Sequence, residues 1–186
     1  MTSNAVTVKR SSRETNVSVT LLLHGSGRFQ GTVGDPLVTH LLETLVRYAG
    51  MDVSVEASGD ERHHLAEDVA LTLGRALRRA LPDTGVARFG EVTVPMDEAL
   101  VHVAVDLVDR PYYRSDLVPE SMGEHVLRSL VTEAKITFHQ MTLRPGEEHH
   151  LFEATFKAFG LALARALEPS TRGLSLKGKV EWEESS

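Results

Sequence analysis

The chain has 186 residues, of which 41% are apolar and 25% are charged, and its net charge is −6 at neutral pH. The acidic balance and the lack of a basic block argue against nucleic acid as the main partner. No apolar run approaches the ~18 residues of a membrane span, and Met1–Ser12 lacks the apolar segment of a signal peptide. We therefore expect a cytoplasmic protein without a membrane partner. Because the chain has no cysteine, any metal must be held by histidine and carboxylate side chains.

The first half of the chain alternates strand patterns with helix patterns. Val, Thr and Leu recur at every second residue in the expected strands, and apolar residues recur every three to four residues in the expected helices. The expected order is strand 5–10, strand 16–23, short strand 28–33, helix 37–46, strand 51–57 and helix 63–81.

The second half repeats this order. Its expected elements are an extended segment at 92–94, strand 100–107, a loop over 111–121, helix 126–134, strand 136–143 and helix 149–167. We therefore predict an α+β fold with an internal duplication: a first repeat over 1–84, a second over 85–179 and an acidic tail over 180–186. Each half must cover the other's apolar face, by packing either sheet to sheet or helix to helix. No flexible linker separates them, so one compact unit is expected.

The duplication is clearest at a His-His-x-x-Glu motif. His63-His64 with Glu67 and His149-His150 with Glu153 lie 86 residues apart, and each opens a helical pattern. Over 63–81 and 149–167, ten of nineteen residues are identical. Such self-similarity is the mark of a repeated structural unit.

Helix geometry gives this motif its chemistry. Residues three and four apart share a helix face, so Glu67 can join either His63 or His64 on a metal ion while the other ring points elsewhere. Imidazole and carboxylate together suit manganese, iron or zinc. A single copy is better explained as a solvated helix start, where acidic residues are common. Two copies at matched helix starts favour a metal site.

A series of motifs runs in fixed order from about residue 6 to residue 179. They are Arg13-Glu14-Thr15, His40-Leu41-Leu42, His63-His64 with Glu67-Asp68, Arg88-Phe89-Gly90, Pro95-Met96-Asp97-Glu98-Ala99-Leu100, Arg110-Pro111, Phe138-His139, His149-His150 with Glu153, Phe156-Lys157-Ala158 and Lys177-Gly178. In this order they resemble the imidazoleglycerol-phosphate dehydratase family of histidine biosynthesis.

The resemblance implies a fold, a cofactor and an assembly. The fold is a duplicated α+β unit of the ribosomal protein S5 domain 2-like type. The cofactor is manganese, with two ions per site between subunits, and trimers assemble into a homo-oligomer of 24 subunits. The implied metal ligands are His40, His63, His64, Glu67, His139, His149, His150 and Glu153.

The implied reaction removes water from imidazole glycerol phosphate, a small phosphorylated imidazole substrate, to give imidazole acetol phosphate. The residues expected to face this substrate are Glu14, Arg88, Arg110, Ser175 and Lys177. Arg and Lys suit a phosphate dianion through charge-assisted hydrogen bonds. Glu14 is the candidate base for the carbon-bound proton, with the ligand carboxylates Glu67 and Glu153 as the alternatives.

Three positions near the expected site depart from the family pattern. Thr39 replaces the aspartate before the first ligand histidine, Glu147 replaces an asparagine, and Leu176 replaces a serine or threonine. Two alternatives to the dehydratase therefore stay open. One is a divergent paralogue of the same fold acting on another phosphorylated substrate, and the other is a non-catalytic metal-assembled shell.

Overall fold

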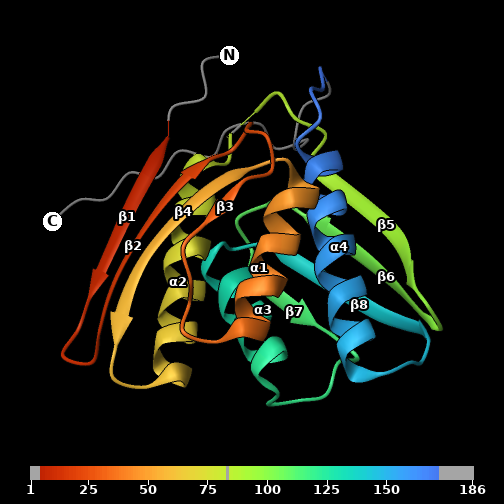
Figure 1. Cartoon of the computed structure of the whole chain (residues 1–186). Helices are drawn as coiled ribbons and strands as arrows, with labels where there is room; N and C mark the ends of the chain where they lie inside the picture. The colour runs from red at the N-terminus through yellow and green to blue at the C-terminus, as the bar shows by residue number, and fades with distance from the viewer. Residues whose placement is uncertain (1–4, 83, 172–186) are drawn as a thin grey trace, which may run out of the picture.

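The structure is a computed structural model that describes residues 5–82 and 84–171. Within these residues, two four-stranded sheets enclose four helices (Figure 1). The first half contains β1 (Val6–Ser11), β2 (Thr15–Leu22), β3 (Phe29–Gln30), α1 (Pro36–Ala49), β4 (Asp52–Gly59) and α2 (Arg62–Ala80). The second half contains β5 (Phe89–Met96), β6 (Ala99–Asp106), β7 (Tyr112–Arg114), α3 (Met122–Glu133), β8 (Thr137–Arg144) and α4 (Glu148–Ala166).

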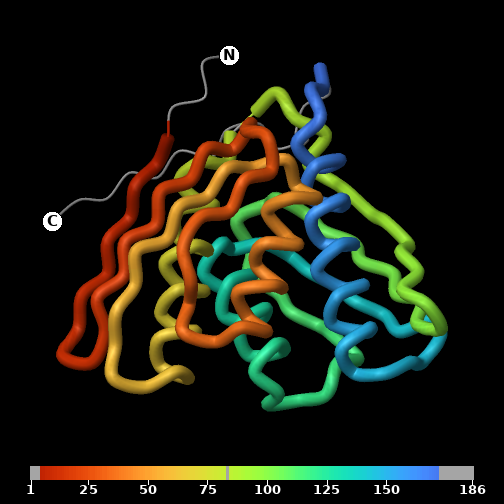
Figure 2. Tube along the Cα trace, in the orientation of Figure 1, coloured from red at the N-terminus to blue at the C-terminus, as the bar shows by residue number. Residues whose placement is uncertain are grey.

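The two halves have the same topology, which confirms the duplicated α+β fold. The strand orders are β1-β2-β4-β3 and β5-β6-β8-β7, and in each sheet only the short strand runs parallel to its neighbour. The helices lie between the sheets, with α1 against α4 and α2 against α3 (Figures 1 and 2). Of the two packing modes left open, the structure therefore has helix against helix.

The predicted loop over 111–121 is wrong at its start, where Tyr112–Arg114 forms β7. This strand pairs in parallel with Thr137–His139, more than twenty residues later, so no local sequence pattern predicts it. The extended segment at 92–94 is part of the longer strand β5, which continues through Pro95. Because β5 is an edge strand, proline can occupy it without removing a needed hydrogen bond.

The segment Gly34-Asp35-Pro36, between the expected strand 28–33 and the expected helix 37–46, is the start of α1. The Asp35 carboxylate accepts the backbone N–H of Val38 at 3.0 Å, and Pro36 occupies the first turn, where a missing N–H costs nothing. Gly50, with φ of 69°, ends the helix in the left-handed conformation. This start places His40 in the second turn of α1.

Alternating residues of the inner strands build a core that joins the two halves. Val17, Val19 and Leu21 of β2 point inward, as do Val101 and Val103 of β6. Helix residues from both halves complete one continuous buried cluster. No helix among the described residues is long and apolar enough to cross a membrane.

The helix pairs approach closely at the glycine that the duplicated motif repeats. A Cβ on Gly74 would lie 2.5 Å from the carbonyl oxygen of Leu130 in α3, and one on Gly160 would lie 2.7 Å from that of Leu45 in α1. Real Cβ atoms do not come this close to backbone, so both positions require glycine. The repeated glycine thus sets the spacing of both helix pairs.

We expect Gly74→Ala and Gly160→Ala to destabilise the protein, although alanine is the better helix former. Propensity alone would gain about 1 kcal/mol, whereas an extra methyl group in a packed contact costs about 1–3 kcal/mol. Thermal unfolding should show a lower Tm for both variants and an unchanged Tm for the control Arg79→Ala, at an exposed position of α2. A raised Tm in either glycine variant would contradict this packing.

Candidate metal centre and active site

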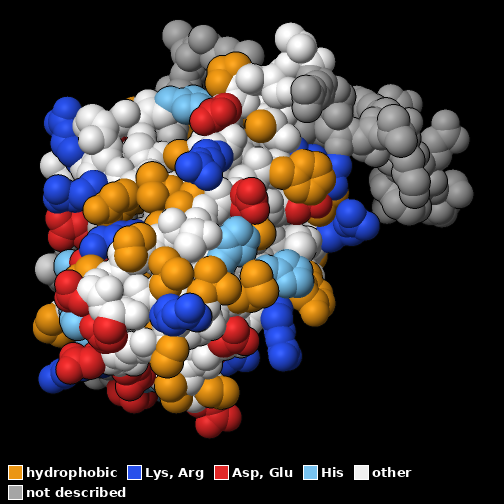
Figure 3. All heavy atoms as spheres, turned by 90° about the vertical axis from the view of Figure 1, so that its right-hand side faces the viewer, with side chains coloured by type: hydrophobic (Ala, Val, Ile, Leu, Met, Phe, Trp, Pro, Cys, Tyr) orange, Lys and Arg blue, Asp and Glu red, His pale blue; other side chains and the backbone are white. Residues whose placement is uncertain are grey.

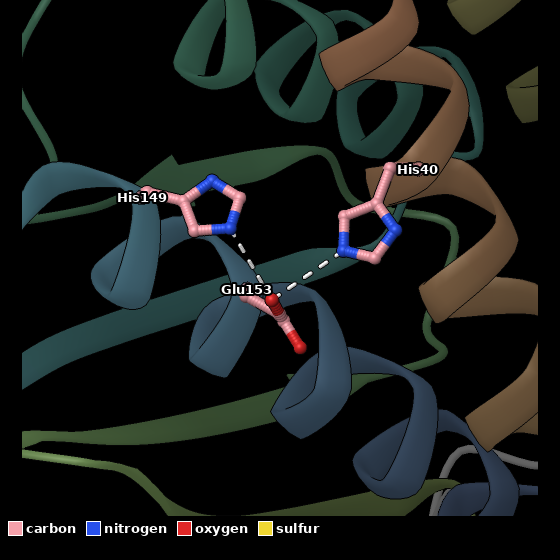
Figure 4. A group of neighbouring side chains, drawn as sticks. All are labelled: His40, His149 and Glu153. Carbon is pink, nitrogen blue, oxygen red and sulfur yellow. Dashed lines mark hydrogen bonds and ion pairs between the residues drawn. The ribbon is translucent and has the colours of Figure 1, made fainter.

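The second HHxxE motif forms a triad with a histidine from the first half. Glu153 Oε2 lies 3.5 Å from His149 Nε2, one turn earlier in α4, and 3.4 Å from His40 Nε2 in α1. The two imidazole rings stack with their centroids 6.1 Å apart. Figure 4 shows the carboxylate between them. The other carboxylate oxygen accepts from Lys157 Nζ at 2.7 Å, so Oε2 is left for the imidazoles.

The first HHxxE motif forms the matching triad with a histidine from the second half. Glu67 Oε1 lies 3.5 Å from His125 Nε2 in α3, and the His63 and His125 rings are 4.8 Å apart. His125 Nε2 is buried and has no hydrogen-bond partner among the described residues. Each triad therefore takes two residues from an HHxxE helix and one from a helix of the opposite half.

His125 was missed by the sequence analysis, although the repeat contains a signal for it. At an offset of 85 residues, His40-Leu41-Leu42 with Leu45-Val46 aligns with His125-Val126-Leu127 with Leu130-Val131. The buried residues that follow each histidine share one helix face. The copies around His40 and His125 are 85 residues apart, whereas the HHxxE motifs are 86 residues apart. This difference of one residue hides the match in an alignment at a single offset.

Both triads have the composition and spacing of a divalent metal site. Within each group, one ligand atom per residue lies within 4.8 Å of the others. Bonds of about 2.0–2.2 Å to one ion place neighbouring ligand atoms about 3–3.5 Å apart, which matches the 3.4–3.5 Å contacts of Glu153 with His40 and His149 and of Glu67 with His125. The buried, unpartnered His125 nitrogen is what a ligand atom presents before it binds an ion. The residues therefore fit a metal.

The remaining histidine of each motif points toward a β-hairpin. His64 Nδ1 lies 3.3 Å from Glu14 Oε2, in the turn between β1 and β2. His150 Nδ1 lies 3.1 Å from both oxygens of Glu98, in the turn between β5 and β6. The structure thus selects the i, i+4 pairing for each ligand carboxylate, and the second imidazole faces elsewhere.

Charged groups around α4 shift three pKa values. The backbone N–H of Glu147, with the Glu98 N–H and the His150 ring, lowers the pKa of Glu98 to about 2. The same contact with Glu98 raises the pKa of His150. The Lys157 ammonium, assisted by His40, lowers the pKa of Glu153. Both carboxylates are therefore ionised at neutral pH, and an ionised Glu153 is the form that binds a cation.

The Asp68 carboxylate fixes the hairpin that carries Glu14. It accepts hydrogen bonds from the Thr15 hydroxyl and, at 2.7 Å, from Arg10 Nε. Asp68 follows Glu67 in α2, so one helix turn supplies both a triad residue and the anchor of the hairpin. The Glu14 side chain itself is exposed beside His64.

The N-terminal turns of the four helices and the hairpins β1–β2 and β5–β6 lie on one side of the molecule, the lower edge in Figure 1. We call this side the triad edge. The implied substrate residues Arg88 and Arg110 lie at the opposite end of the second sheet, which we call the arginine edge. At this end, Phe89 of β5 pairs with Asp106 of β6, which pairs with Thr137 of β8. Eight residues of β5 separate the two edges, about 25 Å at the usual rise per residue. One chain does not bring the arginines to its own triads.

At the arginine edge, Arg88 is held by Asp106 through two hydrogen bonds, and this ion pair raises the pKa of its guanidinium. His139, on β8, is exposed beside the Tyr112 ring at 5.2 Å and belongs to neither triad. The Thr39 hydroxyl donates to the Asp35 carbonyl at 2.8 Å, so it supports the start of α1. Ser175, Leu176 and Lys177 lie outside the described residues.

Comparison with known proteins gives a consistent result. The family model described as imidazoleglycerol-phosphate dehydratase matches residues 33–163. A chloroplastic imidazoleglycerol-phosphate dehydratase of Pisum sativum is 44% identical over 89% of this chain, which spans 64% of that longer relative. The enzyme of the same name from Dehalococcoides mccartyi is 39% identical over 97% of this chain and 100% of its own length.

Solved structures agree with this result. The structure of IGPD from Pyrococcus furiosus in complex with (S)-C348 superposes with a TM-score of 0.81 at 34% identity, covering 93% of this chain and all of that one. Imidazoleglycerol-phosphate dehydratase from Staphylococcus aureus superposes with a TM-score of 0.80 at 28% identity, covering 90% of this chain and all of that one.

Proposed function

The chain belongs to the imidazoleglycerol-phosphate dehydratase family, and we propose that it removes water from imidazole glycerol phosphate to give imidazole acetol phosphate. In this proposal the protein is a hydro-lyase of histidine biosynthesis and acts in the cytoplasm. The observation that carries the proposal is the pair of repeat-related triads, each with two imidazoles and one carboxylate from both halves of the chain. Turnover of imidazole glycerol phosphate by manganese-loaded protein is the direct test.

The proposed cofactor is manganese, two ions per site. Six proposed ligands are the triad residues, and the other two are the hairpin-facing histidines. They are His40, His149, Glu153, His63, Glu67, His125, His64 and His150. This set contains His125 in place of the His139 expected from the sequence. Of these two histidines, only His125 faces a ligand carboxylate. When bound, such ions stabilise negative charge that develops on a leaving oxygen.

The proposed assembly is a homo-oligomer of 24 subunits built from trimers. His64 and His150 point away from the triads of their own chain, so shared ions would need ligands from neighbouring copies. The outer face of the second sheet supports this, because Phe89, Tyr112, Met141 and Leu143 are exposed on it at 41–61%. Figure 3 shows apolar side chains gathered on this side of the molecule. The outward residues of the first sheet, such as Ser18, Thr20 and Glu56, are polar.

The chemical step needs a base for a carbon-bound proton, and Glu14 is suited to that role. Its carboxylate stands on an anchored hairpin, is exposed to an incoming substrate, and lies beside the proposed ligand His64. Glu67 and Glu153 are less suited, because each already faces two imidazoles. A cationic side chain from the arginine edge of another copy would hold the substrate phosphate.

Glu14→Gln should lower turnover by about 10²–10⁴-fold, the usual contribution of a general base. The variant keeps the volume and a polar tip but loses the base. Steady-state kinetics measure the effect, while metal content and Tm should match wild type, since exposed substitutions change stability by only about 0.5 kcal/mol. Unchanged turnover would remove Glu14 from the mechanism, and accompanying metal loss would make it a ligand.

His125→Ala should lower bound manganese by about one ion per chain, whereas His139→Ala should leave metal content near wild type. The two variants make the same change in the same half, so metal analysis after gel filtration compares them directly. Loss in His139→Ala alone would restore His139 as the ligand. In the wild type, binding should weaken in acid, because a protonated imidazole cannot hold a metal ion.

Leu143→Arg should break the proposed assembly into smaller species. An arginine on the exposed face of the second sheet would place unpaired charge in a buried contact. The matched control is Ser54→Arg on the outer face of the first sheet, which should keep the wild-type particle. Light scattering after size exclusion gives both masses, and a full-size Leu143→Arg particle would argue against this face as an interface.

A further inference from the structure

Glu98 joins the β5–β6 hairpin to the N-terminus of α4. Its Oε1 accepts the backbone N–H of Glu147 at 2.7 Å. Both of its oxygens also lie 3.1 Å from Nδ1 of His150. No sequence motif that we assigned to metal or substrate includes Glu98, and the proposed mechanism does not use it.

This contact determines which nitrogen of His150 can bind a metal. An ionised carboxylate only accepts hydrogen bonds, so Nδ1 must carry the proton that it donates to Glu98. In the neutral imidazole, the free lone pair is then on Nε2. Ligand histidines are commonly oriented by such a carboxylate on the second ring nitrogen.

We propose that Glu98 is a positioning residue for His150, holding the ring and its Nδ1–H tautomer so that Nε2 is presented to the metal. The inference rests on the proposed function only in taking His150 as a ligand. The Glu147 contact keeps Glu98 in place, because it ties the carboxylate to the backbone from which His150 extends.

The internal duplication supports this role. Glu14 directly precedes β2 as Glu98 directly precedes β6, and each faces Nδ1 of the second histidine of an HHxxE motif. The two carboxylates differ in how firmly they are held. His64 Nδ1 lies 3.3 Å from both Glu14 and Glu61, and it makes no hydrogen bond to a described residue. The Glu98 carboxylate, held by the Glu147 N–H, therefore orients a ligand. The Glu14 carboxylate stands on an anchored hairpin but is not itself held in this way, so it is free to move a proton.

A competing explanation for the contact between Glu98 and His150 is that these two residues form a separate metal site together with Asp97. Asp97, Glu98 and His150 are close enough to share an ion. However, the closest approach of Asp97, 3.6 Å, is to Nε2, whereas Glu98 contacts Nδ1. The two carboxylates thus serve different ring nitrogens, which favours orientation by Glu98 over joint coordination.

The first measurement is manganese affinity by competition with a chelator. Glu98→Gln still accepts the Glu147 N–H but loses the charge, and we expect it to bind manganese about 10–100-fold more weakly, the usual effect of removing such a partner. Asp97→Asn and Glu14→Gln should bind as tightly as wild type. Wild-type affinity in Glu98→Gln would overturn the proposal, as would an equal loss in Asp97→Asn, which would indicate a third metal site.

The second measurement needs neither metal nor turnover. In metal-free protein above the imidazole pKa, ¹⁵N NMR should show His150 as the Nδ1–H tautomer, and Glu98→Ala should shift it toward Nε2–H. Wild-type protein with Nε2–H would overturn the proposal. A purely structural role for Glu98 would lower the Tm without changing tautomer or affinity. Protein that shows both effects yet does not turn over imidazole glycerol phosphate would refute the proposed function and leave this inference standing.

Discussion

The close contact between parallel helices is the constraint on which the site depends. Gly160 of α4 contacts α1 at Leu45, and Glu153 of α4 contacts it at His40, so the contacts advance in the same direction along the two helices. Gly74 and Glu67 contact α3 in the same way. A carboxylate on one helix reaches an imidazole on the next only when the two helix axes lie close together. The glycine two turns away therefore governs whether each triad forms. Packing and chemistry are therefore properties of the same helix face.

Duplication explains why a motif within one helix needs the other half. Each HHxxE helix supplies an imidazole and a carboxylate, but the second imidazole comes from the helix that the opposite half packs against it. A single half would leave both its apolar helix face and its ligand pair incomplete. The same contact stabilises the core and completes each triad, so loss of one should be accompanied by loss of the other.

The sequence predicted the parts of this fold that repeat locally and missed those that depend on distant partners. Periodicity located the helices and most strands, and the HHxxE copies identified the candidate ligands on α2 and α4. The strand Tyr112–Arg114 has no such signal, because its partner lies beyond α3. His125 was missed because its carboxylate is on another helix. Glu98 was noted only as part of a motif, and its role was missed because its partner follows 52 residues later. Spacing along one helix can be derived from sequence, whereas contacts between helices and hairpins need the packed structure.

The distance from the triads to Arg88 and Arg110 bears on how copies of this chain would meet in the proposed assembly. Carboxylates gather at the triad edge, where the positive ends of the helix dipoles favour them, whereas Arg88 and Arg110 lie about 25 Å away along β5. If a phosphorylated substrate binds at the triads and Arg88 or Arg110 holds its phosphate, as proposed, these arginines must come from another copy, because its own chain places them too far away. A two-fold contact that joins triad edge to triad edge would leave these cations outside as well. A head-to-tail contact would instead set the arginine edge of one copy against the triads of the next, and such contacts form a ring when the rotation between copies closes. The proposed trimer is one ring that would complete every site in this way.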